Sequence, residues 1–439
     1  MNRNLIRGFV CLWLLGGLLQ VTGCSRSVIN YQIAESIGTV GMYDNNEPVE
    51  SPQMKMEREQ AESEAAIEAA MVETLDQADT LAKGYQYEEA IAFLQNADID
   101  QEDERVQTAI AGYQTKMEQL YEYEGNIPHL SFPNLIVDTE LAFDGDGNAS
   151  TYDGVMITLS EFEKILQELY NSGYFLIDIH SLAEETVNES GQTVLTSRNP
   201  VIPEGKKPMV LSIDNLNYGQ IKNGDGIATR LTLDQNGEVK AVYTDNGGHD
   251  VTGDYDVVPV LEAFIAEHPD FSFQGARGII GLSGKYGAFG YQVEEDDDVA
   301  DYSDNRKQVK AIAAALVEDG WTLACESYSY DKLNEYSFDS LKEDITHWEN
   351  TIGELTGPVD TLIFPYGSEV DYASEKLSWL TGEGFEYFIG LWPSDDYREV
   401  QDEYMRQTRR MVNGYMLKNS PNLFSTFFSV SGILDEERP

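Results

Sequence analysis

From about residue 125 onward, short apolar runs alternate with longer segments of helical periodicity, and this alternation is what most limits the possible folds. Runs typical of buried strands lie at residues 129–137, 175–179, 209–213, 278–282, 322–324, 362–365 and 388–391. Amphipathic patterns typical of helices lie among them, at 159–170, 255–268, 305–319, 340–355 and 374–383. Apolar strands that alternate with helices predict a mainly parallel sheet covered by helices, either open or closed into a barrel.

One segment of this region has a different pattern. Between the strand at 209–213 and the helix at 255–268, apolar and polar residues alternate on both sides of Asn236-Gly237. Asn-Gly between two alternating runs is a strong signal for a tight hairpin. We therefore predict a hairpin insertion near residues 230–245, overhanging the carboxyl ends of the strands.

The N-terminus has the order of a processing signal. Arg3 and Arg7 precede an apolar run at residues 9–19 that is short for a membrane span. The following Val21-Thr22-Gly23-Cys24 resembles a bacterial lipobox, in which the cysteine is lipidated and becomes the new N-terminus. We expect residues 1–23 to be a lipoprotein signal peptide and Cys24 the lipid acceptor. The mature protein would then lie outside the cytoplasmic membrane on a lipid anchor. An ordinary secretory signal or an uncleaved anchor is the alternative.

Two segments separate this signal from the alternating region. Residues 24–53 lack periodicity and predict a flexible tether. Residues 54–123 have apolar residues at helical spacing, and Gly84-Tyr85 lies in a stretch that resembles the centre of a tetratricopeptide repeat. Only one copy is present, and one repeat cannot bury a continuous core. A single helical hairpin or a helical spacer is therefore expected.

Charge and cysteine content exclude some partners and some kinds of stabilisation. The formal net charge is -48, which repels phosphate backbones, so nucleic acid is not an expected partner. Of the three cysteines, Cys11 lies in the signal and Cys24 is the predicted lipid acceptor. Cys325 has no cysteine left to pair with, so stability is expected to come from packing.

Three sequence motifs occur in order within residues 125–439. Leu211-Ser212-Ile213-Asp214-Asn215 reads as a buried strand that ends in two polar residues. Gly320 to Tyr330 and Phe364-Pro365-Tyr366-Gly367 follow. Together they resemble the three motifs of the polysaccharide deacetylases. The resemblance implies an α/β fold, namely a polysaccharide-deacetylase-like distorted β/α barrel over residues 124–439, preceded by the short helical segment.

The resemblance also implies a chemistry, and the motif residues depart from it. The family needs a divalent metal held by one aspartate and two histidines, beside an aspartate base. The base position is Asp214, whereas the ligand positions are Asn215, Glu326 and Tyr330. Asparagine and glutamate suit calcium or magnesium better than zinc, and a protonated tyrosine is a poor ligand. A divalent metal is therefore expected only if the protein is active.

Two further positions bear on activity. Ile363 stands where the family often has an arginine, and no histidine follows His347 to act as a general acid. None of the five histidines has metal-site spacing to another. Whether the protein is an enzyme stays open.

The expected partner is a glycan, either peptidoglycan or another polysaccharide. Tyr328, Pro365 and Tyr366 follow predicted strands and are the candidate substrate-binding residues. Three hypotheses follow. The protein binds glycans as a degenerate deacetylase, hydrolyses their N- or O-acetyl groups at an altered metal site, or is a scaffold that acts through its N-terminal helices.

Overall fold

The computed structural model describes residues 50–219, 221–295, 302–392, 394 and 396–439. The predicted signal peptide, Cys24 and most of the predicted tether lie outside the described residues. The chain divides into two compact units, and the division along the sequence falls between Ala69 and Ala70. Within the described part, no helix is both long enough and apolar enough to cross a membrane.

The first unit contains the beginning of helix α2 (Pro52–Lys83). Its side chains there are exposed except for the half-buried Met54. Polar side chains one helical turn apart hydrogen-bond each other, as Arg58 does with Glu62 at 2.9 Å. Such pairs support a solvated helix that has no packed face.

In the second unit, the end of α2 continues into α3 (Tyr87–Asn96) and α4 (Glu104–Glu118). The segment therefore holds three helices. Tyr85, in the turn between α2 and α3, has a left-handed backbone with φ of 63°. Its buried ring packs at centroid distances of 5.7 Å from Phe175 and 5.4 Å from Phe273. The turn is thereby fixed onto residues of the α/β region.

Seven parallel strands close into a barrel. In order around the ring they are β9 (Lys207–Ile213), β13 (Ile279–Leu282), β14 (Thr322–Cys325), β15 (Thr361–Ile363), β16 (Tyr387–Leu391), β18 (Tyr404–Met411) and β2 (His129–Phe132), which pairs again with β9. The fold class predicted from the sequence, a distorted β/α barrel with helices ahead of it, is confirmed.

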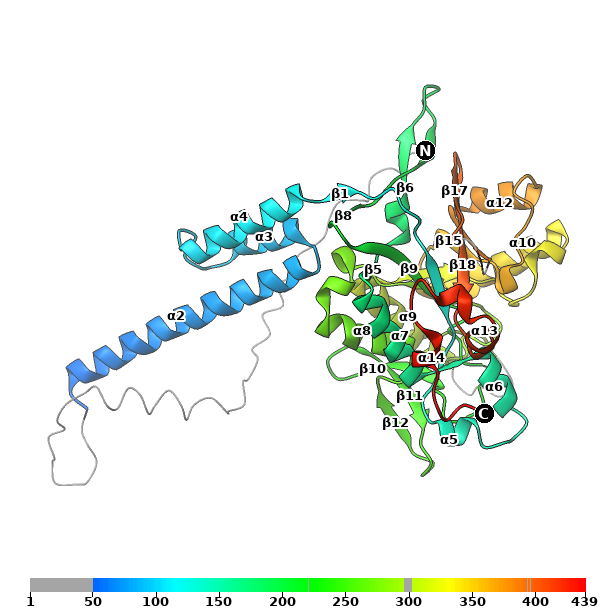
Figure 1. Cartoon of the computed structure of the whole chain (residues 1–439), viewed down its shortest axis with the longest axis horizontal. Coiled ribbons are helices and arrows are strands. Elements are labelled where there is room, and N and C mark those ends of the chain that lie inside the picture. The colour runs from blue at the N-terminus through cyan, green and yellow to red at the C-terminus, as the bar shows by residue number, and fades with distance from the viewer. Residues whose placement is uncertain (1–49, 220, 296–301, 393, 395) are drawn as a thin grey trace. The chain divides into compact units, whose positions relative to one another are not determined.

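Helices surround the strands in Figure 1. The longer ones are α7 (Leu159–Asn171), α8 (Val257–Glu267), α9 (Tyr302–Asp319), α10 (Phe338–Trp348) and α12 (Glu375–Glu383). Alternate strand residues such as Leu211 and Leu282 pack in the same apolar core as the helices. The residues between them, such as Val210 and Ile279, belong to a second cluster, as the two-residue period of a strand requires.

The remaining strands and helices lie outside the seven-stranded ring of the barrel. The strands are β1 (Tyr121–Glu122) paired with β8 (Val201–Ile202), β3 (Leu135–Ile136) with β4 (Ile157–Thr158), β5 (Tyr174–Leu176) with β9, β6 (Ala183–Val187) with β7 (Thr193–Ser197), β17 (Arg398–Gln401) with β18, and the sheet of β10 (Arg230–Leu233), β11 (Val239–Thr244) and β12 (Asp250–Gly253). The short helices are α5 (Thr139–Ala142), α6 (Ala149–Val155), α11 (Glu354–Thr356), α13 (Gly414–Asn419) and α14 (Val430–Ile433). The hairpin of β10 and β11 carries Asn236-Gly237 at its turn.

Several elements differ from the sequence expectation. The single strand expected at residues 129–137 is wrong: it divides into β2 and β3 around Pro133, which has no N–H for a ladder. The helix expected at 340–355 contains a π-helical turn at Glu349–Gly353. Strand β18 was not expected, because Arg406, Gln407 and the residues up to Arg410 interrupt any apolar run.

Candidate functional site

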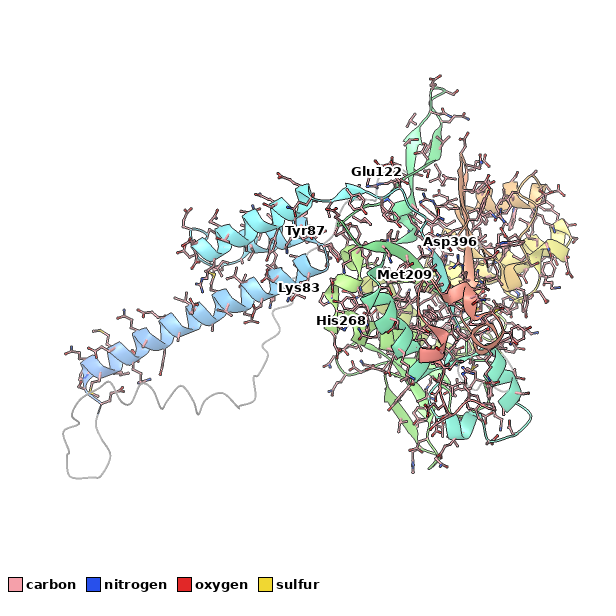
Figure 2. The ribbon with its side chains drawn as sticks, viewed as in Figure 1. Lys83, Tyr87, Glu122, Met209, His268 and Asp396 are labelled. Atoms are coloured by element: carbon pink, nitrogen blue, oxygen red, sulfur yellow. The ribbon has the colours of Figure 1, made fainter. Side chains whose placement is uncertain are left out.

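A cavity of about 340 Å³ lies at the carboxyl ends of the barrel strands. Its walls include Asn134 after β2, Asp214 and Asn215 after β9, Tyr330 after β14 and Asn413 after β18. Met209, labelled in Figure 2, lies on β9, the strand that leads to Asp214. The strand ends are where β/α barrels place their functional residues, so this cavity is the candidate site.

Asp214 is fixed by two donors at the edge of this cavity. Its Oδ1 accepts a hydrogen bond from Ser131 Oγ at 2.7 Å, and its Oδ2 accepts one from Arg409 Nη2 at 2.9 Å. Only 9% of the Asp214 side chain and 1% of the Arg409 side chain are exposed to solvent. A buried ion pair of this kind is strongly held once formed, because removing one partner leaves the other charge unpaired.

Glu326 directly follows β14 and is fully buried. Its Oε2 accepts a hydrogen bond from the backbone N–H of Asn215 at 2.7 Å, and its Oε1 lies 3.9 Å from Arg409 Nη2. Gly281 makes room for it, since a Cβ there would come within 2.4 Å of Oε2. Burial, reinforced by the charge of Asp214, raises the pKa of Glu326 well above its ordinary value.

Asn215 has a left-handed backbone with φ of 50°, a conformation that asparagine tolerates better than most residues. Its side-chain oxygen accepts hydrogen bonds from Ser283 Oγ at 2.6 Å and from Asn217 Nδ2 at 2.8 Å. The amide is thus held by one neighbour after β9 and one after β13.

The residues at the three ligand positions do not fit a divalent metal. The side-chain oxygen of Asn215 is occupied by two donors, and the phenol of Tyr330 keeps its proton because burial raises its pKa well above its ordinary value. The base position, Asp214, is paired with a guanidinium. Among the described residues, no group of three histidine, cysteine, aspartate or glutamate side chains could hold a metal ion.

The candidate substrate-binding residues have different placements. Tyr366 is 59% exposed, and its ring lies 5.0 Å from that of Tyr330, which lines the cavity. Pro365, the residue before it, is buried. Tyr328 does not line the cavity; its ring stacks on His347 at 3.6 Å and its hydroxyl bonds Glu294. The structure therefore brings Tyr366 close to the cavity wall but not Tyr328.

The loops that follow the barrel strands at the cavity also contain residues with a strained backbone. Left-handed non-glycine residues are concentrated after four barrel strands, namely Asn215 and Tyr218 after β9, Phe289 after β13, Ser327 and Tyr330 after β14, and Tyr366 after β15. Each such residue costs on the order of 1 to 3 kcal/mol. Strain of this kind gathers where a fold must hold side chains in a fixed geometry for function.

A buried carboxylate supports the cavity wall from behind. Asp256 is 1% exposed and accepts hydrogen bonds from Tyr218 Oη at 2.5 Å and from Asn134 Nδ2 at 2.8 Å. The backbone N–H groups of Leu135 and Val257 also donate to it, at 3.1 and 2.9 Å. Because Tyr218 and Asn134 line the cavity, this network fixes two of its side chains.

Two residues that hold the site were missed in the sequence. Arg409 comes from β18, which did not read as a strand, and Ser131 is a small residue within the predicted strand at 129–137. The only available signal for Arg409 was its alternation with Gln407 and Met405 along an extended segment. That signal is weak, because alternation alone does not say which face is inside.

No protein-family model and no curated protein matches the sequence. Among solved structures, the chain is similar to Streptococcus pyogenes deacetylase PplD in complex with acetate. The two share 10% sequence identity with a TM-score of 0.38, over 69% of this chain and 99% of that one.

Proposed function

We propose that this protein is a lipid-anchored envelope protein that binds cell-surface or environmental glycans at the carboxyl end of a polysaccharide-deacetylase-like barrel. In this proposal it does not hydrolyse them through a metal. The observation that carries the proposal is the pairing of Asp214 with Arg409 beside the cavity. Both oxygens of the base position accept hydrogen bonds from the protein, and the ligand positions hold an amide, a buried acid and a phenol.

Exposed aromatic residues support a glycan as the ligand. They follow three strands that are neighbours in the barrel: Tyr366 after β15, Trp392 after β16 and Tyr415 after β18. Their exposed fractions are 59%, 56% and 61%. Because the strands are parallel, all three residues lie at the same end of the barrel as the cavity. Aromatic rings present a flat apolar face with a polar tip, which suits the apolar faces and hydroxyl groups of sugars.

Glycan binding is tested by calorimetric titration of the mature protein with N-acetylated chito-oligosaccharides in the presence of EDTA. We expect saturable binding that Tyr366→Ala weakens at least tenfold. The matched control is Tyr121→Ala, which removes a tyrosine that is 40% exposed on β1, paired with β8 and away from the strand ends. If the two variants bind the oligosaccharide with equal affinity, Tyr366 does not contribute to glycan binding.

The lipid anchor is tested separately. Cys24→Ala should release the protein from the membrane fraction or leave it as an unprocessed precursor, because the thiol that accepts the lipid is gone. Membrane fractionation and N-terminal sequencing check this. Unchanged fractionation together with unchanged processing would contradict the anchor.

A further inference from the structure

We infer that Arg409 is the resident cation of this site, standing in for the divalent metal on which the resembled family depends. The inference deepens the proposed function, since it states why glycan binding here would need no metal. It rests on the arrangement of Arg409, Asp214 and Glu326, and it can be tested whether or not a glycan binds.

The guanidinium approaches two acidic side chains that follow different strands, β9 and β14. Nη2 of Arg409 is 2.9 Å from Asp214 Oδ2 and 3.9 Å from Glu326 Oε1. In the family that the three motifs resemble, the position of Asp214 holds the base and the position of Glu326 holds a metal ligand. A positive charge therefore faces both the base position and a ligand position.

Arg409 is held in this place from its other side. Its Nη1 donates to the carbonyl oxygens of Ile389 at 3.3 Å and Gly390 at 3.5 Å, both on β16. A side chain that is 1% exposed and anchored across two strands cannot swing out to admit an ion. A divalent cation beside it would meet a like charge at short range with little solvent screening.

The surroundings of Glu326 also support Arg409 as the cation of the site. Within the described part of the chain, Glu326 Oε1 has no hydrogen-bond donor, although it is fully buried. Buried carboxylate oxygens need a partner, and the charge of Arg409 is the compensation that the structure offers. Removing that charge would leave Asp214 Oδ2 and Glu326 Oε1 facing the position that the guanidinium had occupied, where they could serve as oxygen ligands.

The test compares metal binding before and after this charge is removed. Arg409→Met keeps much of the side-chain volume without the charge, and Arg409→Gln also keeps a donor toward Asp214 and the β16 carbonyls. Thermal unfolding of each purified protein is followed in EDTA and with added MnCl2 or CaCl2, and calorimetry gives the stoichiometry.

We expect the unaltered protein to melt at the same temperature with and without metal. Arg409→Met or Arg409→Gln should melt lower in EDTA, regain stability with the added ion, and bind it at about one equivalent per chain. Adding Asp214→Asn and Glu326→Gln to Arg409→Met should abolish the response, because both carboxyl ligands are gone.

Arg410→Met is the matched control. It removes the neighbouring positive charge, which pairs with Asp396 at 2.7 Å. It should give no metal response above that of the unaltered protein, whose many surface carboxylates set the background.

Stoichiometric metal binding by the unaltered protein would overturn the inference. A folded Arg409→Gln variant that shows no metal response would also overturn the inference. In that case Arg409 would only orient Asp214. If Arg409→Met fails to fold, the outcome rests on Arg409→Gln and on the titration of the unaltered protein.

Discussion

The network behind the cavity wall predicts a specific loss of stability when the Tyr218 hydroxyl is removed. In Tyr218→Phe the buried ring stays, but Asp256 loses the donor that lies 2.5 Å from its Oδ2. The Asp256 carboxylate accepts four hydrogen bonds and donates none. Burial raises the pKa of Asp256, and these four donors oppose that shift because they favour the ionised form. A hydrogen bond to a charged group contributes about 1.5 to 3 kcal/mol, and that is the expected decrease in the free energy of unfolding.

A second tyrosine provides the matched control. Tyr397 Oη also donates to a carboxylate, that of Glu399 at 2.8 Å, but Tyr397 is 43% exposed. Tyr397→Phe should change the free energy of unfolding by no more than about 0.5 kcal/mol, because water replaces the lost partner. Equilibrium urea unfolding of both variants, compared through the transition midpoint, measures the difference. Equal losses in the two variants would refute the assignment of Asp256 as a buried, fully paired carboxylate.

Two other substitutions test contacts elsewhere in the second unit. Tyr85→Ala should lower the free energy of unfolding by about 3 to 5 kcal/mol, because it deletes a buried ring that packs on Phe175; a loss below about 1 kcal/mol would contradict that packing. His180 lies between two carboxylates, with Nδ1 at 2.7 Å from Asp178 and Nε2 at 3.1 Å from Asp360. Although burial opposes its charged form, the hydrogen bonds and charges of these carboxylates raise the pKa of His180 to about 10. The unfolded pKa is about 6.5, so the stabilisation is fully present below that pH and is lost as the pH rises through about 10. The destabilisation by His180→Gln should therefore be largest near pH 6 and shrink toward pH 10 in thermal unfolding; the same destabilisation at both ends would contradict the ion pairs.

The sequence predicted the helix-covered parallel sheet because its signal is carried by many residues at once, whereas the closed barrel was implied only by the resemblance of the three motifs. Apolar strands such as 209–213 and 278–282 are buried on both sides, so they read as continuous apolar runs, and their ends must meet at one edge of a parallel barrel. This is why Asp214, Asn215 and Tyr330 could be brought to one site from sequence positions more than a hundred residues apart.

The charge balance of the site could not be predicted in the same way. Arg409 and Asp214 are separated by 195 residues, and no local pattern links them. Arg409 and Arg410 are adjacent in the sequence but point to opposite faces of β18, one to Asp214 and the other to Asp396. The position of β18 between β16 and β2 determines which of the two arginine side chains points into the barrel.

Tyr328 shows a second limit. It follows β14 as Tyr330 does, and both were equally good candidates to face the site. The side chain of Tyr328 instead stacks on His347 of α10, while its backbone N–H bonds Asp344 at 2.7 Å. The direction of a side chain in a loop depends on such tertiary partners, which the spacing of residues along the chain does not encode.

The central claim is that this barrel binds glycans without metal-dependent hydrolysis, and acetate release tests it most directly. The purified mature protein is incubated with N-acetylated chito-oligosaccharides at stoichiometric concentration, with EDTA or with added Zn2+, Mn2+ or Ca2+, and free acetate is measured over time. Our account predicts no acetate above that of an Asp214→Asn variant under any of these conditions, together with binding of the oligosaccharide in EDTA. Acetate release that a metal restores after EDTA treatment, and that Asp214→Asn abolishes, would contradict the account and establish an active deacetylase with an altered metal site.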